Sequence, residues 1–248
     1  MRLSLRERFE IAAREVVGFA PGPRVGAAQA EHSMIFSAQD DVGPSPRLLD
    51  LALAAASHAR ETPLVGLADR IDKGVRYPEV WPGEHYRLLA GLVRATQAKS
   101  VIEIGTATGL SSLAMLDAMS ARGGLVTFDI IDWRDYPGHV LTDEDFEDGR
   151  LMQILDDVSD PMVSSKYVEL FGDVDLVFLD AKKDGLQELA ILRFLDSLDF
   201  RNAPVLVLDD IRVWKMLSVW RGIQRPKFDV TSLGHWSGTG LVDYSAES

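Results

Sequence analysis

From residue 100 onward, short apolar runs alternate with segments of helical spacing, and this alternation limits the fold more than any other feature of the sequence. Such runs, bounded by polar or glycine positions, are typical of buried strands in a parallel sheet whose two faces are covered by helices. The expected strands span 101–105, 125–129, 151–155, 174–180 and 205–209, and the expected helices 110–121, 161–171, 186–198 and 213–223. The sequence therefore predicts an α/β fold with five parallel strands.

The C-terminal tail departs from this alternation. Residues 228–244, FDVTSLGHWSGTGLVDY, contain two strand-like pieces with no helical segment between them. We expect residues 234–238, which begin and end with glycine, to form the turn of an antiparallel hairpin. Five parallel strands and one hairpin predict a seven-stranded, mostly parallel sheet. This arrangement differs from the six parallel strands of the dinucleotide dehydrogenases.

The first 75 residues contain helical patterns separated by proline and glycine. Apolar residues at 5, 9, 12 and 16 recur at helical spacing, and a second helical run follows the prolines at 44 and 46. A third helix is expected to begin near Pro82 and to continue to residue 97. We therefore divide the chain into an N-terminal helical cap or arm, 1–75, and a sheet domain, 76–248. The pattern does not choose between a cap and a dimerisation arm, and a homodimer is expected.

Composition excludes several classes of partner. The chain carries 38 acidic and 26 basic residues, a formal net charge of −12, whereas nucleic acids and anionic membranes attract basic surfaces. Its longest uncharged stretch, 104–116, is shorter than the roughly 20 apolar residues of a membrane-spanning helix. The absence of cysteine excludes disulfides, thiolate zinc sites and a cysteine nucleophile. We expect a cytoplasmic protein that acts on a small molecule, with no nucleic acid and no membrane as partner.

The expected strand 101–105 is followed by a glycine loop and a helix. In VIEIGTATGLSS, Gly105 and Gly109 let the backbone approach a ligand closely, and the helix N-terminus favours polar groups. The spacing lacks the middle glycine that a pyrophosphate requires. We expect the carboxylate of Glu103 to point into the same site, where it suits a cationic amino-acid group. Thr106 and Ser111 are further candidate ligands in this segment.

The next expected strand ends on Asp129, 24 residues after Gly105. An acid at this place can accept hydrogen bonds from both hydroxyls of a ribose. Taken alone, Asp129 could equally cap the turn that follows. Together with Glu103 and the two glycines, it predicts a nucleoside-binding site.

Three carboxylates are expected at one edge of the sheet. The strand 174–180 ends on Asp180, and the strand 205–209 is followed directly by a second acid, so that Asp209 and Asp210 end it. Three like charges at neighbouring strand ends are costly unless a cation shares the site or their pKa values rise. Oxygen ligands without histidine or cysteine favour Mg²⁺ or Ca²⁺ over zinc.

Simpler roles compete for some of these residues. Asp184 can cap the helix 186–198, so Asp180 is not needed for that task. Asp210 could cap a helix that begins near Ile211. The two lysines that follow Asp180 could be a solvated pair.

The motif Glu103-Ile-Gly105-x-x-x-Gly109 and Asp129 resemble the first two motifs of class I S-adenosylmethionine-dependent methyltransferases. The terminal hairpin resembles the reversed last strand of their Rossmann-like sheet, and the likeness covers residues 83–244. It implies that S-adenosyl-L-methionine is the cofactor, with the glycine loop at its amino-acid end and the acid of the second strand at its ribose. Asp156 and Asp157 stand where family members contact adenine, and either could do so.

The stretch LDAKKD followed by LDD resembles the metal-dependent catechol and caffeoyl-CoA type O-methyltransferases and related bacterial natural-product enzymes. The resemblance implies that Asp180, Asp209 and Asp210 bind a divalent cation, either Mg²⁺ or another hard ion such as Ca²⁺ or Mn²⁺. It also implies that Lys183 is the catalytic lysine and that Asp180 contributes to catalysis and cofactor binding. Two departures are Asp210, where the family usually has asparagine, and Ala107, where catechol enzymes carry an aromatic residue.

Three tryptophans near expected strand ends are candidates for the acceptor wall: Trp133, Trp214 and Trp236. Trp214 follows Asp210 by four residues, where caffeoyl-CoA type enzymes place an aromatic wall. We assign His235 to the hairpin turn, with a second base as the alternative, and His85 to a structural role.

The leading hypothesis is a divalent-metal-assisted O-methyltransferase acting on a small hydroxylated, aromatic or catechol-like molecule. One alternative keeps the methyl donor but uses a protein base without metal. An NAD(P)-dependent oxidoreductase is disfavoured by the glycine spacing, by Glu103 and by the hairpin. A non-catalytic S-adenosylmethionine-binding subunit is disfavoured by the presence of Asp180, Lys183 and Asp209.

Overall fold

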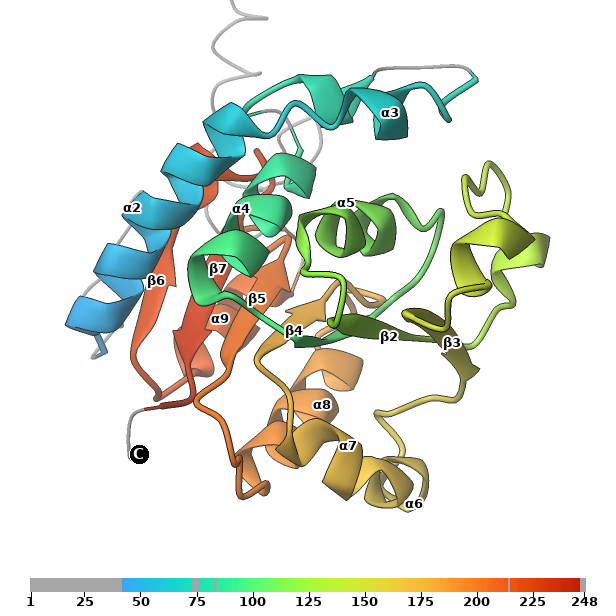
Figure 1. Ribbon diagram of the computed structural model, residues 1–248. Coiled ribbons are helices and arrows are strands. Elements are labelled where there is room, and N and C mark those ends of the chain that lie inside the picture. The colour runs from blue at the N-terminus through green and yellow to red at the C-terminus, as the bar shows by residue number, and fades with distance from the viewer. Residues whose placement is uncertain (1–41, 73–75, 83, 214, 246–248) are drawn as a thin grey trace, which may run out of the picture.

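The computed structural model describes residues 42–245 except 73–75, 83 and 214. Seven strands form one sheet in the order β3-β2-β1-β4-β5-β7-β6 (Figure 1). The strands are β1 (Ser100–Ile104), β2 (Gly124–Asp129), β3 (Leu151–Leu155), β4 (Leu176–Leu179), β5 (Val205–Asp209), β6 (Lys227–Asp229) and β7 (Thr239–Asp243). Strands β1 to β5 are parallel, and β7 is antiparallel to both β5 and β6. The predicted parallel sheet with its terminal hairpin is confirmed.

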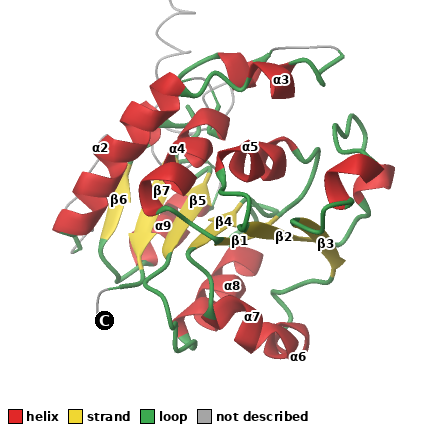
Figure 2. Cartoon of the chain, viewed as in Figure 1, coloured by secondary structure: helices red, strands yellow, loops and turns green. Residues whose placement is uncertain are grey.

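The helices lie in two layers, one on each face of the sheet (Figure 2). On one face lie α2 (Pro46–Glu61), α4 (Tyr86–Thr96) and α5 (Leu110–Ala118), with α3 (Val65–Ala68) beside α5. On the other lie α6 (Pro161–Ser164), α7 (Val168–Gly172), α8 (Leu186–Asp196) and α9 (Met216–Gly222). In β4, Leu176 and Phe178 face the first layer while Val177 and Leu179 face the second, which is the two-residue period of a strand buried on both faces.

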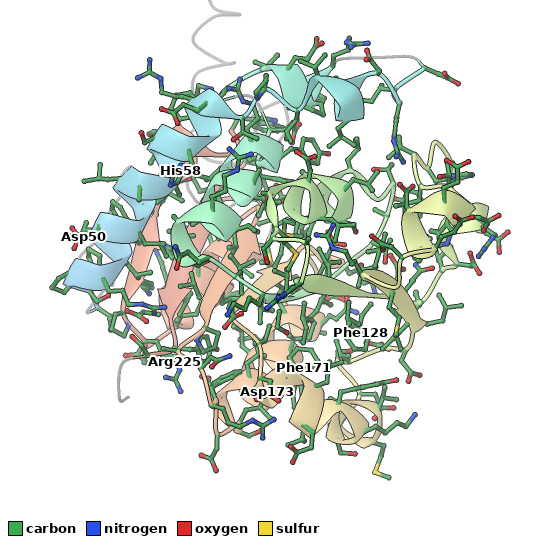
Figure 3. All side chains as sticks on the ribbon, in the orientation of Figure 1. Asp50, His58, Phe128, Phe171, Asp173 and Arg225 are labelled. Atoms are coloured by element: carbon green, nitrogen blue, oxygen red, sulfur yellow. The ribbon has the colours of Figure 1, made fainter. Side chains whose placement is uncertain are left out.

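The second layer has an aromatic core. Phe128 of β2 and Phe171 of α7 pack with ring centroids 5.7 Å apart between the sheet and the helices (Figure 3). Two expected helices differ from the sequence prediction here. The span 161–171 is divided into α6, a 3₁₀ turn at Ser165–Tyr167 and α7. Helix α9 begins at Met216, later than predicted, because residues 210–213 form a turn in which Val213 N–H donates to the carbonyl of Asp210.

Helix α2 is part of the main core. Its buried alanines lie against α4 so closely that a Cβ on Gly91 would be 2.2 Å from the carbonyl oxygen of Ala55. Ser45 caps the helix and also donates to Asp243 of β7 at 2.6 Å. The described part of the predicted arm, from residue 42, therefore shares one core with the sheet rather than forming a separate cap. The predicted division at residues 75 and 76 stays a prediction for the rest.

Two of the helices expected in the N-terminal region differ in how far the structure describes them. The first expected helix, with its apolar residues at 5, 9, 12 and 16, lies outside the described residues. The third expected helix begins at Tyr86, four residues after Pro82, and a separate 3₁₀ turn at residues 77–79 precedes it. In the part of the chain that the structure describes, no helix combines the length and apolar character that crossing a membrane requires.

Candidate active site

A cavity of about 760 Å³ lies at the carboxyl ends of β1, β2, β3 and β4. This is the edge of an open parallel sheet at which ligands bind. The predicted site residues that line it are Gly105, Asp129, Asp156, Asp157 and Asp180. Apolar and aromatic lining comes from Phe128, Val158 and Tyr136, none of which was predicted from the sequence. The cavity thus combines carboxylates with a surface on which a flat ring can pack.

Asp129 fixes the glycine loop beside this cavity. Its Oδ2 accepts hydrogen bonds from the backbone N–H groups of Thr106 at 2.9 Å and Ala107 at 3.1 Å. Its Oδ1 accepts from Ile130 at 2.7 Å and Ile131 at 3.1 Å. The carboxylate is therefore held in place by the backbone of two loops before any ligand binds.

Glu103 differs from its prediction because it does not line the cavity. In β1 it shares a face with Val101, towards α5, and it is fully buried there. Its carboxylate accepts hydrogen bonds from the hydroxyls of Ser111 and Ser112 in the first turn of α5. Burial raises the pKa of Glu103 to about 7, although the two serines and Thr127 favour its ionised form. Glu103 therefore supports the glycine loop from behind.

Three other predicted cofactor residues also lie off the cavity. Gly109 precedes α5 with a φ of +84°, Ser111 is committed to Glu103, and Thr106 contributes its backbone to Asp129 and its hydroxyl to Thr127 at 2.8 Å. None of the three is among the cavity-lining residues that the structure describes. They shape the loop that borders the cavity.

Replacing Glu103 with glutamine is expected to remove a pH-dependent part of the stability. The folded pKa of about 7 exceeds the ordinary value of 4.5, so the native state binds more protons between these values and stability falls as pH rises. The contribution is fully present below about pH 4.5 and is lost as pH rises through 7. In urea unfolding, the free energy of unfolding of the wild type should fall by about 2 kcal/mol more than that of Glu103→Gln when the pH is raised from 5.5 to 8. Parallel pH profiles would contradict the raised pKa.

Lys183 lies among the three predicted metal carboxylates. Its Nζ donates to Asp180 and lies 2.8 Å from Oδ2 of Asp210 and 3.5 Å from Oδ2 of Asp209. The Lys183 backbone has a φ of +63° and donates to Glu188 at 2.6 Å, which directs the side chain back to the cluster. Burial opposes the charge, but the three carboxylates outweigh it and raise the pKa of Lys183. This direction is opposite to the one that a proton acceptor needs.

The other acids separate into two roles. Asp184 accepts hydrogen bonds from the backbone of Leu186 at 2.8 Å and Gln187 at 2.9 Å, as predicted for the start of α8. Asp210 does not cap α9, since α9 begins six residues later; it accepts from Ser237 and Lys183 instead. Asp210 therefore belongs to the acidic cluster.

Two histidines join this cluster, and sequence reasoning assigned neither of them to it. Nδ1 of His235 lies 3.5 Å from one carboxylate oxygen of Asp209 and 3.5 Å from one of Asp210. Its Nε2 lies 2.9 Å from Glu84, and Nδ1 of His85 lies 3.3 Å from Asp209. The predicted hairpin contained a signal for His235. Because β7 runs antiparallel to β5, the turn that precedes β7 lies at the carboxyl end of β5, where Asp209 is opposite Thr239.

These residues fit a divalent cation. Asp209, Asp210 and His235 each offer a ligand atom within 4.8 Å of the others, and so do Glu84, His85 and His235. Asp180 belongs to neither group; it reaches the pair at the end of β5 through the Lys183 ammonium. The Asp209 side chain is 3% exposed, and its Oδ1 has no hydrogen-bond partner among the described residues. A buried carboxylate oxygen without a hydrogen bond is costly, and a cation would remove that cost.

The two candidate tryptophans that the structure describes lie in different settings. Trp133 is buried, stacks on Phe146 at 5.5 Å and does not line the cavity, so the structure places it in the core rather than in an acceptor wall. Trp236 is 58% exposed and packs edge-on against His235 at 5.6 Å. Trp214 lies outside the described residues. Of the three candidates, Trp236 stands beside the cluster.

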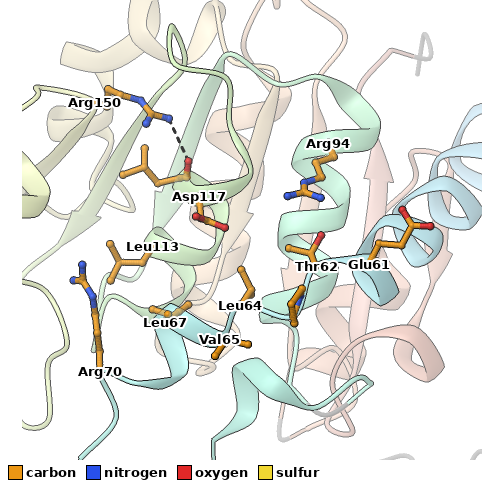
Figure 4. A pocket seen from close by; sticks show the side chains of 13 residues that line it. Glu61, Thr62, Leu64, Val65, Leu67, Arg70, Arg94, Leu113, Asp117 and Arg150 are labelled. Carbon is orange, nitrogen blue, oxygen red and sulfur yellow. Dashed lines mark hydrogen bonds between the residues drawn. The ribbon is translucent and has the colours of Figure 1, made fainter.

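A second cavity, of about 590 Å³, lies between the end of α2, α3 and α5 (Figure 4). Its arginines are in part committed to the fold: Arg150 donates to the carbonyl of Leu116 at 3.2 Å, and Arg70 pairs with Asp145 at 2.6 Å. Its lining contains no residue that the sequence predicted for the site. The chemistry therefore concentrates at the strand ends.

The chain was compared with known proteins. Residues 78–190, a little under half of the chain, match the model of a family described as O-methyltransferase. No curated protein sequence matches the chain significantly. A Staphylococcus aureus structure, of a protein proposed to be a caffeoyl-CoA O-methyltransferase, is 15% identical with a TM-score of 0.50, and the match covers 79% of this chain and 97% of that one.

Two further solved structures are similar. The O-methyltransferase TomG of Streptomyces achromogenes, involved in tomaymycin synthesis and solved with S-adenosylmethionine, is 19% identical with a TM-score of 0.48, covering 91% of this chain and 99% of that one. A Geobacter sulfurreducens methyltransferase is 20% identical with a TM-score of 0.48, covering 73% and 87%. The likeness to the Staphylococcus aureus structure supports the fold. The family match over residues 78–190 and this sheet order together indicate an S-adenosylmethionine-dependent O-methyltransferase.

Proposed function

We propose that this O-methyltransferase methylates a hydroxyl of a small aromatic or catechol-like molecule with the help of a divalent cation. The observation that carries the proposal is the buried Oδ1 of Asp209, which accepts no hydrogen bond from the described residues. Beside it, Asp210 and His235 offer ligand atoms within 4.8 Å. When bound, a divalent cation would orient the acceptor oxygen and lower the pKa of its hydroxyl.

The cavity at the strand ends supports the binding of S-adenosyl-L-methionine. Asp129 is held ready for the ribose, and Asp156 and Asp157 border the part of the cavity that a base would occupy. Asp180 lines the cavity and also contacts Lys183, so it joins the cofactor site to the acidic cluster. Donor and acceptor would therefore meet near Asp180, and fixing two reactants in line accounts for much of the rate of such a transfer.

Lys183 is the proposed acceptor of the hydroxyl proton. In the reaction the acceptor oxygen attacks the sulfonium methyl carbon, the methyl–sulfur bond breaks and the hydroxyl proton leaves. The carboxylates around Lys183 raise its pKa and so hold its own proton. Lys183 can act as a base only when another positive charge is bound to the same carboxylates. That charge would repel the ammonium and lower its pKa, which favours the neutral amine.

Replacing Asp129 with alanine is expected to weaken S-adenosylmethionine binding about 100-fold, since two hydrogen bonds to a charged acceptor are worth about 3 kcal/mol together. Titration calorimetry with S-adenosylmethionine and S-adenosylhomocysteine measures the loss. Asp117→Ala on α5, at the edge of the other cavity, is the matched control and should bind as the wild type does. Unchanged affinity in Asp129→Ala would refute the ribose assignment.

The metal and acceptor assignments are tested by turnover. S-adenosylhomocysteine formation is measured with matched mono- and ortho-dihydroxylated aromatic acceptors, in Mg²⁺, in Mn²⁺ and in excess chelator. We expect turnover with an ortho-dihydroxylated acceptor that chelator abolishes and added ion restores. One observation favours the metal-independent alternative, namely that the Lys183 ammonium contacts all three carboxylates. Full turnover in chelator would establish that alternative and end the metal proposal.

A further inference from the structure

His235 reaches the acidic cluster from a separate part of the chain. It lies in the turn before β7, and its Nδ1 is 3.5 Å from Oδ1 of Asp209 and 3.5 Å from Oδ1 of Asp210. The side chain is 12% exposed. The cluster is therefore not made of oxygen ligands alone, which was the basis for expecting a hard cation.

The second nitrogen of His235 already has a partner. Nε2 lies 2.9 Å from Oε2 of Glu84. An ionised carboxylate only accepts hydrogen bonds, so Nε2 carries a hydrogen, and a neutral ring has its lone pair on Nδ1. Nδ1 lies 2.6 Å from the hydroxyl of Ser237, which also contacts Asp210, so a cation would replace this hydroxyl as the partner of Nδ1. A carboxylate behind one imidazole nitrogen is the arrangement that orients histidine ligands of metal ions. Glu84 thus prepares Nδ1 to bind a cation on the side of the aspartates.

Two buried atoms beside Nδ1 have no hydrogen-bond partner among the described residues. They are Oδ1 of Asp209 and Nδ1 of His85, which lie 3.3 Å apart. The two oxygens of Asp209 face different partners, because Oδ2 faces Lys183 at 3.5 Å while Oδ1 faces the two histidines. Lys183 therefore does not satisfy Oδ1. This independent observation points to a ligand on the histidine side of Asp209.

We propose that His235 is a metal ligand together with Asp209 and Asp210, and that the site prefers a first-row transition cation over Mg²⁺. Glu84 acts as the positioning residue for His235. The inference rests on the metal-assisted function proposed above and names the class of its ion. Imidazole nitrogen suits iron, nickel, copper and zinc, whereas Mg²⁺ prefers oxygen ligands and keeps its waters.

The test detects a nitrogen ligand directly. The full chain is stripped with chelator, loaded with Mn²⁺ and studied by electron spin-echo envelope modulation, which detects coupling between the manganese spin and a bound imidazole. We expect a ¹⁴N coupling that changes to ¹⁵N in protein grown with ¹⁵N-labelled histidine. His235→Gln should abolish it. His58→Gln, the same change on α2 outside the cluster (Figure 3), should leave it intact.

A competition titration measures the preference. Wild-type protein should bind Mn²⁺ or Zn²⁺ at least about tenfold more tightly than Mg²⁺, and Glu84→Gln should weaken Mn²⁺ binding by about tenfold or more. These two readings, with the labelled wild type, decide the matter even if His235→Gln does not fold.

Two outcomes would overturn the inference in different ways. Stoichiometric Mn²⁺ binding without a histidine coupling would overturn the ligand role of His235 and leave metal-assisted transfer standing. The absence of Mn²⁺ binding would overturn both the inference and the metal-assisted function. A coupling that survives in His235→Gln but is lost in His85→Gln would assign the nitrogen to His85 instead.

Discussion

Replacing Asp209 with asparagine is expected to lower turnover at least about 1,000-fold, equivalent to roughly 4 kcal/mol of transition-state stabilisation. Asp209 is the most deeply buried acid of the cluster, and it faces Lys183 on one side and two histidines on the other. The neutral amide removes the charge that a cation needs. Because Asp209 does not line the cofactor cavity, the affinity for S-adenosylhomocysteine should stay within about threefold of wild type.

The control separates catalysis from stability. Burial raises the pKa of Asp209, but His85, His235 and Lys183 outweigh it and hold the pKa well below its usual range, so Asp209→Asn should also cost about 3 kcal/mol of stability. Asp243 is equally buried but is paired with Arg47 and lies opposite Val205, at the other end of β5. Asp243→Asn should lose similar stability and keep its turnover below the unfolding temperature. Equal losses of turnover in the two variants would argue for a structural role of Asp209.

Replacing Gly105 with alanine is expected to destabilise the fold by roughly 3 kcal/mol or more and to abolish cofactor binding. The added Cβ would lie 2.0 Å from the backbone oxygen of Asp180, and the backbone here has a φ of +107°. The clash is with main chain at the carboxyl ends of β1 and β4, so relief requires the two strand ends to separate. Urea unfolding and titration calorimetry measure the two losses.

Gly138→Ala isolates the conformational part of this effect. Gly138 has a φ of +75°, and no described atom lies within 4 Å of an added Cβ. Its replacement should cost only about 1 kcal/mol, the penalty of a left-handed alanine, with cofactor affinity unchanged. Similar losses in both variants would mean that close contact with Asp180 is not what requires glycine at 105.

The fold was predictable because its pattern is local. The runs at 151–155 and 205–209 match β3 and β5 residue for residue. Strand β5 is buried throughout and ends on Asp209, whereas β3 lies at the edge of the sheet and carries Gln153 among its apolar residues. The predicted strand 174–180 was too long, because only Leu176–Leu179 remains in the ladder. The close packing of α2 on α4 involves small residues of two separate segments. The sequence of one segment contains no sign that it packs against the other, so this contact could not be predicted.

Some residues of the candidate site could also be predicted from local sequence, and others could not. The residues that line the cavity follow directly from strand ends, so Asp129 and Asp180 could be found from the sequence. Glu103 was misplaced because its orientation depends on which face of β1 it occupies, and that face is set by packing against α5. The carboxylate and histidines beside Asp209 come from the start of α4 and from the hairpin, which only the tertiary fold brings together.

The position of Asp180 has a thermodynamic consequence. Asp180 borders the donor cavity and shares the Lys183 ammonium with Asp209 and Asp210. A cation that competes with this ammonium for the carboxylates changes the net charge around Asp180. A sulfonium donor carries one positive charge more than its product. By reciprocity, the factor by which the ion changes donor affinity equals the factor by which the donor changes ion affinity. Each methyl transfer removes the positive charge of the sulfonium, so the affinity for the ion would change each time donor is converted to product.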